Sequence, residues 1–320
     1  MTPGEIGARA FQSLLTLILL SFFVYGLIGL MPGDPVDLMA AGNPRMTAED
    51  TARLRQIHGL DRPVILRYLD WAKAAVTGDL GYSRLYGLPV TEMILPRIWQ
   101  TFLLLGSSLL LTLLLAVPLG VWAGADKGGW GDKIVNAACL AGISLPPFWL
   151  GLLLISFFAV TLGWLPASAD LESGDTGQRL RSAVLPIATL TLANLAVYVR
   201  HLRSAMSDAL KADHIRTAAA KGCSRSRVLW RHALQNAAAP VVTVLMLDIG
   251  VLFGGAMTVE MVFSWPGMGK LMFDAVMGND YNLALTGFLV LAGFVLLGGL
   301  LADVAYGLLD PRVGKKAEEK

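Results

Sequence analysis

The sequence predicts an all-α polytopic membrane protein with six transmembrane helices and both termini in the cytoplasm. Hydrophobic residues make up 55% of the chain and charged residues 16%, and the mean hydropathy is +0.59. The apolar residues form long blocks, and six of these approach the length of about 20 residues that a membrane-spanning helix needs. Between Arg200 and Arg231 there are eight Lys and Arg but only two Asp, which predicts a cytoplasmic loop. An ordinary soluble domain is excluded.

The first span is expected at 10–31. It is longer than the apolar core of a signal peptide, and only Arg9 flanks it with positive charge. It ends at Pro32-Gly33-Asp34-Pro35, which lacks a clear small-residue cleavage site and stops the helix. We therefore expect it to remain in the protein as an anchor.

The polar segment 32–97 is expected to form a small extracytoplasmic cap. Its acidic and basic residues balance, and it is too long for the positive-inside rule to decide its side. Two helices are predicted within it. One, at 49–58, has Thr47 as its N-cap, and the other, at 64–76, is amphipathic.

The second and third spans are expected at 101–125 and 134–162, joined by a tight hydrophilic loop at 126–133. The third span contains Pro146-Pro147. Proline leaves a backbone carbonyl free, and in lipid a neighbouring helix must satisfy it. The double proline therefore predicts a kinked helix packed against others.

The second half of the chain supplies three more spans. In order, we expect an exposed loop at 163–183, a short fourth span at 184–199, a cytoplasmic loop at 205–238, a fifth span at 240–263, an outer segment at 264–282, a sixth span at 283–309 and a basic cytoplasmic tail at 310–320. The whole chain, 1–320, is predicted to be a single transmembrane domain whose core, 98–309, holds five of the spans. No repeat of 20–50 residues recurs, so repeat architectures are excluded.

The most basic stretch between two apolar runs is 211–240, which we name the coupling segment. We predict two short helices broken at Gly222, which suits a left-handed C-terminal cap. Ser224 then offers its hydroxyl as the N-cap of a second helix through Trp230. Two interpretations remain open: a loop that only sets membrane orientation by its charge, or a helical projection that docks on a soluble partner.

The chain carries no pattern typical of an enzyme or of a metal or nucleotide site. It has no Gly-x-x-x-x-Gly-Lys-Ser/Thr loop, and Gly267-Met268-Gly269-Lys270 lacks both the first glycine and the hydroxyl residue. The four histidines lack metal-ligand spacing. Cys139 and Cys223 are predicted to be free thiols. We expect no catalytic residue, no metal and no cofactor in this chain, and no nucleic-acid partner.

One acid, Asp248, is expected in the middle of the fifth span. An acid at a helix centre costs about 2.5–3.5 kcal/mol to insert, so it should face a cavity or another helix. It either lines a path that accepts amines or cations, or is a protonated group bonded between helices. The glycines of this span, Gly250, Gly254 and Gly255, favour close contact with a second subunit. The candidates for the translocation path are Asp248, Asn194, Gln100 and Glu260.

The coupling segment resembles the "EAA" loop of ABC-importer permeases, in the variant of the dipeptide/oligopeptide/nickel permease family. The resemblance lies in Ala218-Ala219-Ala220-Lys221-Gly222, followed after nine residues by the His-Ala-Leu-Gln-Asn-Ala of 232–237. Of the Glu-Ala-Ala typical of the wider superfamily, only Ala218 is retained. Further motifs resemble the same family in order along the chain: 32–35, 59–63, 78–81, 146–149, 259–269, 279–281 and 310–312.

This resemblance implies one of two related membrane subunits in a bacterial-type inner (plasma) membrane importer of peptides, with nickel or a metal chelate as the alternative substrate. The implied partners are a second homologous permease, two cytoplasmic ATP-binding subunits that hold ATP and Mg²⁺, and an extracytoplasmic solute-binding protein. It implies ATPase coupling through Arg216, Thr217, Ala218, Ala219, Ala220, Lys221, Gly222, Ser224, Arg227, His232 and Asn236. It implies an outer loop marked by Trp265, Pro266, Gly267 and Gly269.

Two other classes remain open. An ion-coupled secondary carrier would need a relay of acids or histidines, and Asp248 is the one clear acid at mid-span. A receptor or assembly scaffold would carry no solute flux.

Overall fold

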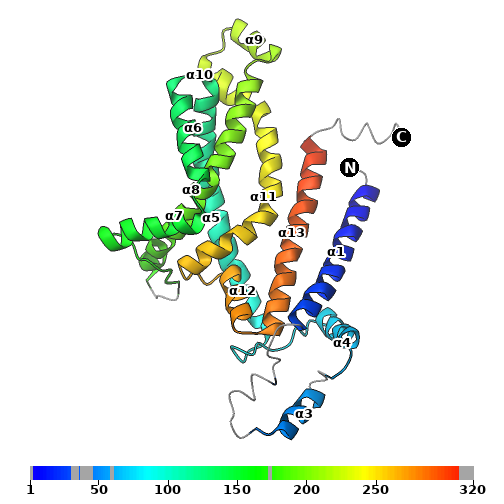
Figure 1. Ribbon diagram of the computed structural model, residues 1–320. Coiled ribbons are helices and arrows are strands. Elements are labelled where there is room, and N and C mark those ends of the chain that lie inside the picture. The colour runs from blue at the N-terminus through cyan, green and yellow to red at the C-terminus, as the bar shows by residue number, and fades with distance from the viewer. Residues whose placement is uncertain (1–2, 30–35, 37–45, 58–60, 172–174, 310–320) are drawn as a thin grey trace. The chain divides into compact units, whose positions relative to one another are not determined.

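A computed structural model describes residues 3–29, 36, 46–57, 61–171 and 175–309 (Figure 1). The described chain is almost entirely helical, which confirms the all-α class. It divides into two compact units, one built mainly from residues 99–270 and the other from residues 7–98 and 271–294.

The first unit is a helical bundle around α8. Its elements in order are α5 (Val90–Ala125), α6 (Trp130–Ile143), α7 (Pro147–Leu154), the π-helical η1 (Ile155–Thr161), α8 (Thr176–Ala209), α9 (Asp213–Ala220), α10 (Arg225–Arg227), the π-helical η2 (Val228–Ala233), α11 (Leu234–Val262) and the start of α12 (Met268–Met277). Helices α5 and α8 approach each other closely at Gly120 and Gly124 of α5, because glycine has no Cβ. A Cβ on Gly120 would lie 2.8 Å from Leu202 Cβ, and one on Gly124 would lie 2.6 Å from Met206 Cβ.

The second unit contains α1 (Pro3–Gly29), α3 (Ala48–Ile57), α4 (Val64–Val76) and the first half of α13 (Tyr281–Leu309). The predicted bounds of the amphipathic helix α4 are confirmed. The predicted N-cap of α3 is confirmed too, because Thr47 Oγ1 accepts a hydrogen bond from Asp50 N at 3.2 Å. The Thr47 backbone N–H and hydroxyl in turn donate to Asp50 and hold the pKa of its carboxyl below the ordinary value.

Four helices are long and apolar enough to cross a membrane: Ile6–Gly29, Val90–Ala125, Thr176–Ala209 and Tyr281–Asp303. A fifth would be the pair Trp130–Ile143 and Pro147–Thr161, bent by 101°. The bend confirms the kink predicted at Pro146-Pro147, since α6 ends at Ile143 and α7 begins at Pro147. This count covers the described residues alone. Helix α11 is not among the four, and the side chains of its residues 247–255 are not described.

Three predicted loops are shorter than expected. Helix α5 begins at Val90 rather than 101, and α6 begins at Trp130 inside the predicted loop 126–133. Helix α8 begins at Thr176, so the predicted exposed loop 163–183 ends eight residues early and the fourth span is not short. Asp175 starts α8 as its N-cap, accepting from Gly177 N at 2.9 Å. The first turns of these helices carry charged residues. The sequence analysis assigned them to loops because each helix extends beyond its apolar part.

Candidate functional site

The predicted break at Gly222 is a helix C-terminus of the Schellman type. Gly222 has φ +78°, in the left-handed region that glycine adopts without strain. Its N–H donates to Ala219 O at 3.0 Å, and the next N–H, of Cys223, donates to Ala218 O at 3.2 Å. These two bonds satisfy the last carbonyls of α9 and turn the chain sharply. The left-handed cap predicted from the sequence is confirmed.

The second helix of the coupling segment starts as predicted but does not stop. Ser224 Oγ accepts from Arg227 N at 3.5 Å and is the N-cap of α10. From there the chain continues through η2 into α11 without a break. The expectation of a second short helix is therefore wrong: the helical hydrogen bonding of η2 joins it to the span that follows. The predicted cytoplasmic loop, 205–238, is likewise helical at both ends.

One face of the coupling segment is fixed to the bundle. Ile215 and Val228 are buried in the apolar core that α5, α6, α8 and α11 share, and Ala218 is buried on the same helix as Ile215. A hydrogen bond of 3.0 Å between Asn236 Nδ2 and His214 Nε2 ties α9 to the first turn of α11. Ala218 thus points inward, whereas Ala219 and Ala220 are exposed.

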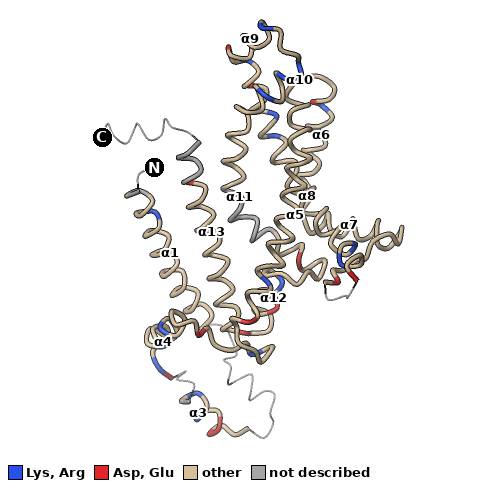
Figure 2. Tube along the Cα trace, turned by 180° about the vertical axis from the view of Figure 1, so that it is seen from behind, with Lys and Arg blue, Asp and Glu red and all other residues tan. Residues whose placement is uncertain are grey.

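The other face is exposed and basic. The exposed side chains include Arg216, Thr217, Lys221, Ser224, Arg225, Arg227, Trp230 and Arg231. Arg216 lies 3.7 Å from Asp213, in an exposed pair. Within the part of the chain that the structure describes, Lys221, Arg225, Arg227 and Arg231 form no ion pair. Figure 2 shows these cations gathered at the α9–α10 end of the first unit. Trp230, 48% exposed, adds a large apolar side chain to the same surface.

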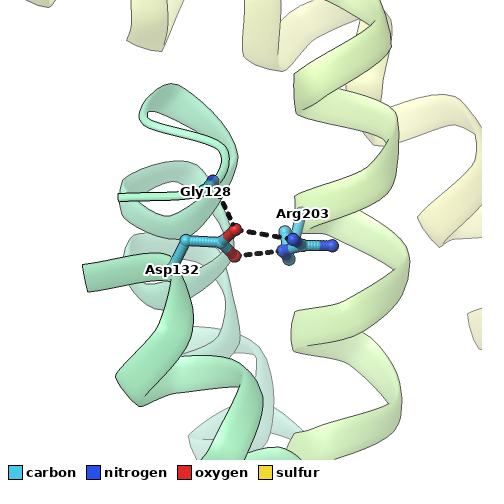
Figure 3. Close-up of polar contacts among 3 residues, drawn as sticks. All are labelled: Gly128, Asp132 and Arg203. Atoms are coloured by element: carbon cyan, nitrogen blue, oxygen red, sulfur yellow. Dashed lines mark hydrogen bonds and ion pairs between the residues drawn. The ribbon is translucent and has the colours of Figure 1, made fainter. Parts of the chain in front are cut away.

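A buried ion pair braces the bundle near this end (Figure 3). Arg203, on α8, holds both carboxylate oxygens of Asp132 in the first turn of α6; its Nη2 lies 2.6 Å from Oδ2, and its Nε contacts Oδ1. Gly128 N also donates to Asp132 at 2.8 Å. The Asp132 side chain is 5% exposed and that of Arg203 23%. Sequence reasoning missed this pair, because nothing in the local pattern shows which acid of the turn 126–133 meets a basic residue of the distant helix α8.

The outer loop is folded over Glu260, which is fully buried. The Glu260 carboxylate accepts from Thr101 Oγ1 at 2.7 Å and from Lys270 N at 3.0 Å. The glycines are needed for this approach, since a Cβ on Gly267 would lie 2.2 Å from Glu260 Oε1. Trp265, almost fully buried, donates its indole N–H to Gln100 O at 3.0 Å.

The loop therefore joins several residues that were predicted separately: Trp265, Gly267, Gly269, Glu260 and, through its backbone, Gln100. Pro266 lies in the same turn. Asn194 donates to Leu190 O at 2.8 Å within its own helix. The side chain of Asp248 lies outside the described residues. A role of these residues in the translocation path stays a prediction.

In the second unit, two distant motifs meet at Asp280. Asp280 begins α13 as its N-cap, accepting from Leu283 N at 3.2 Å. Its other oxygen accepts from Ser83 Oγ at 2.5 Å and from Leu85 N at 3.0 Å. Gly81 is required beside this junction because it has φ +78° and a Cβ there would lie 2.7 Å from Asn282 Nδ2. The sequence had marked both motifs without indicating that they touch.

The described residues give no support for a metal site or for a phosphate-binding loop at 267–270. They contain no group of three or more His, Cys, Asp or Glu that could hold a metal ion. Gly267 to Lys270 form the loop and first turn of α12 rather than a phosphate-binding loop. Both cysteines are free, Cys139 buried and Cys223 partly exposed, as predicted.

Residues 116–315 match the family described as "Binding-protein-dependent transport system inner membrane component". That match covers more than half of the chain. This chain belongs to that family of inner membrane transport components. Residues 6–89 match the family described as the N-terminal part of the same membrane components. The permease is therefore a multi-pass inner membrane protein and the membrane component of an ABC transport system.

Relatives of this permease match over nearly its whole length. The oligopeptide transport system permease protein AppB of Bacillus subtilis is 35% identical over 310 residues, covering 95% of this chain and 97% of its own. The di/tripeptide transport system permease protein DppB of Pseudomonas aeruginosa is 38% identical over 336 residues, covering 93% and 96%. The glutathione transport system permease protein GsiC of Escherichia coli is 36% identical over 301 residues, covering 94% and 95%.

Among solved structures, the MetNI methionine ABC transporter in inward-facing conformations contains a chain of similar fold. The TM-score is 0.53 at 17% identity, and the match covers 66% of this chain and 94% of that one. At this identity the likeness supports the helical permease fold alone.

Proposed function

We propose that this permease forms half of the translocation path of an ATP-driven, binding-protein-dependent importer of peptides. The observation that carries the proposal is the coupling segment: an exposed basic helical reversal whose buried face is fixed to the membrane bundle. The names of the relatives, which specify oligopeptides, di/tripeptides and glutathione, favour short peptides as the solute. The alternative within the same machinery is nickel or a metal chelate.

The turn at Gly222 between α9 and α10 can transmit force, because the chain on either side of it leads into the long helices α8 and α11. Helix α9 follows α8 after three residues, and α10 runs through η2 into α11. A push on the exposed face of α9 or α10 would therefore act on both helices at once. Arg225, Arg227 and Arg231 could pair with acids at the rim of a cytoplasmic ATPase, since guanidinium groups bind carboxylates in a two-pronged geometry. Trp230 would add apolar contact area.

The proposed topology has six spans. The four long apolar helices, the bent pair α6–α7–η1 and α11 together give six, an even number that leaves both termini on one side. The basic coupling segment favours the cytoplasm for that side. The proposed assembly pairs this permease with a second, homologous membrane subunit, two ATP-binding subunits that supply ATP and Mg²⁺, and an extracytoplasmic solute-binding protein.

Gly222 provides the test. Gly222→Val should abolish peptide uptake, because valine at φ +78° is strongly strained and would open the reversal. No atom lies within 4 Å of the Cβ position, so the effect would come from the backbone and not from a clash. Gly222→Asn is the matched control, since asparagine tolerates the left-handed region. It should retain most of the uptake.

The measurement is uptake of a labelled dipeptide into vesicles that contain the whole transporter, with the amount of inserted permease checked by immunoblot. Full uptake by Gly222→Val at normal insertion would disprove the coupling role. Calorimetry of the cognate solute-binding protein with dipeptides, oligopeptides, glutathione and Ni²⁺ would decide between the substrate classes.

The secondary-carrier alternative makes a different prediction. A carrier that works alone would purify without ATP-binding subunits and would respond to an ion gradient in vesicles. The importer should co-purify with an ATPase and should require ATP.

A further inference from the structure

Helix α4 carries an exposed apolar stripe that the proposed function does not use. Ile65, Leu69 and Val76 are 60%, 55% and 89% exposed. At 100° per residue these three side chains fall within one narrow sector of the helix, whereas Asp70 and Lys73 fall outside it. The face that packs against α1 is a third sector, formed by Tyr68 and Trp71. Leu66, 45% exposed, lies between Lys73 and Asp70 on the remaining side. The helix therefore has one protein-facing side, one apolar side, and one side that carries the charged residues together with Leu66.

The contact with α1 is specific. Tyr68 Oη lies 2.7 Å from Ser21 Oγ and also donates to Ile18 O at 3.4 Å. The Tyr68 ring packs edge-on against Phe22, with centroids 5.2 Å apart. Tyr25 and Trp71 lie close by, with ring centroids 5.9 Å apart. The side of α4 that carries Tyr68 and Trp71 is thus fixed along the Ile18–Tyr25 stretch of α1.

This stretch is deep in a membrane-spanning helix. The apolar part of α1 runs from Ile6 to Gly29, and Ser21 lies eight residues before its end, a distance of about 12 Å along the axis. The whole apolar part is about 36 Å long, against a hydrocarbon core of about 30 Å. Ser21 therefore lies roughly 9 Å inside the core, and a tyrosine reaching it cannot belong to a helix in bulk water.

We propose that α4 is an interfacial helix, lying along the boundary between headgroups and acyl chains, with Ile65, Leu69 and Val76 in contact with lipid hydrocarbon. On α1, Leu19 and Phe23 are likewise exposed, at 61% and 62%. Interfacial helices have this division into an apolar and a charged side. Arg67 and Lys73 are long enough to extend their charges to the headgroups. Tyrosine and tryptophan are enriched at the same depth.

The proposal places helix 64–76, which the sequence analysis assigned to a small extracytoplasmic cap, at the bilayer surface. The helix would anchor the segment between the first two spans to the bilayer surface. The inference depends on depth alone, so it holds whichever side of the membrane Gly29 faces.

The test compares two neighbouring positions with a fluorescent amino acid. Dansylalanine would replace Leu69 in one full-length variant and Asp70 in the other, each in nanodiscs containing lipids brominated near the headgroup end of their acyl chains. Both side chains are more than half exposed and differ in the face they occupy. Loss of the Asp70–Arg62 pair should matter little, because both groups are largely exposed. The label at 69 should emit at shorter wavelength and be quenched several-fold more strongly.

A second measurement uses the unaltered chain. Lipids carrying a diazirine on the acyl chain should modify Ile65, Leu69 and Val76 several-fold more than Asp70 and Lys73, in the single permease and in the assembled transporter alike. Equal, weak quenching at 69 and 70 would overturn the proposal. So would loss of the lipid adducts on assembly, since the stripe would then be a contact with another subunit.

Discussion

At the residue scale, the pair Asp132–Arg203 shows why buried charge must be matched. Arg203 presents two donors to one carboxylate, and the backbone of Gly128 adds a third. Removing one partner leaves the other partly buried and unpaired, and such losses cost about 3–5 kcal/mol. The pair holds the first turn of α6 against the part of α8 that leads into α9, close to the surface that we propose for ATPase coupling.

We therefore expect Asp132→Asn to lower the thermal stability of the detergent-purified permease by about 3 kcal/mol, because Arg203 loses its counter-charge. Asp126→Asn, at an exposed position in the same turn, is the control and should change stability little. The measurement is a melting curve for each variant. If both variants melted at the same temperature as the unaltered chain, the pair would contribute nothing to stability.

At the element scale, the coupling segment separates into a structural and a contact face. Val228 is buried against the bundle, whereas Trp230 on the same helix is 48% exposed. Gly222 ends the first helix and Ser224 caps the second, as expected from local chemistry, but the burial of Ala218 depends on how α9 packs.

Two substitutions should separate these faces. Trp230→Ala is expected to weaken co-purification of the ATP-binding subunits without altering the melting temperature. Val228→Ala removes buried methyl groups and should cost about 1–2 kcal/mol of stability. The measurements are pull-down yield and melting temperature for both variants. If the ATP-binding subunits co-purified with the Trp230→Ala variant in normal yield, Trp230 would not be part of the docking surface.

At the scale of the whole molecule, the proposed orientation puts the coupling segment in the cytoplasm. The two free cysteines test this in one unaltered chain, because Cys223 is partly exposed and Cys139 is buried. A membrane-impermeant maleimide should label Cys223 in inside-out vesicles and leave it unlabelled in right-side-out spheroplasts. Cys139 should stay unlabelled in both, as the internal control. Labelling of Cys223 in intact spheroplasts would show that the coupling segment lies outside the cell and that the proposed orientation is wrong.

The sequence by itself determined the features that depend on neighbouring residues: four long apolar helices, the α4 bounds, the bend at Pro146-Pro147, and the reversal at Gly222 with its Ser224 cap. Backbone preferences and hydropathy act over one or two helical turns, so a local pattern is enough to predict them. Helix ends were missed where charged turns extend beyond an apolar run, as at Thr176.

Only the tertiary structure decided which distant polar groups meet. The pairs Asp132–Arg203, Thr101–Glu260 and Ser83–Asp280 each form a hydrogen bond, although their members are 71, 159 and 197 residues apart in the sequence. Each of these side chains could equally have faced water or another partner. The choice is made by helix packing, which brings the groups together and then requires that each buried charge or hydroxyl be satisfied.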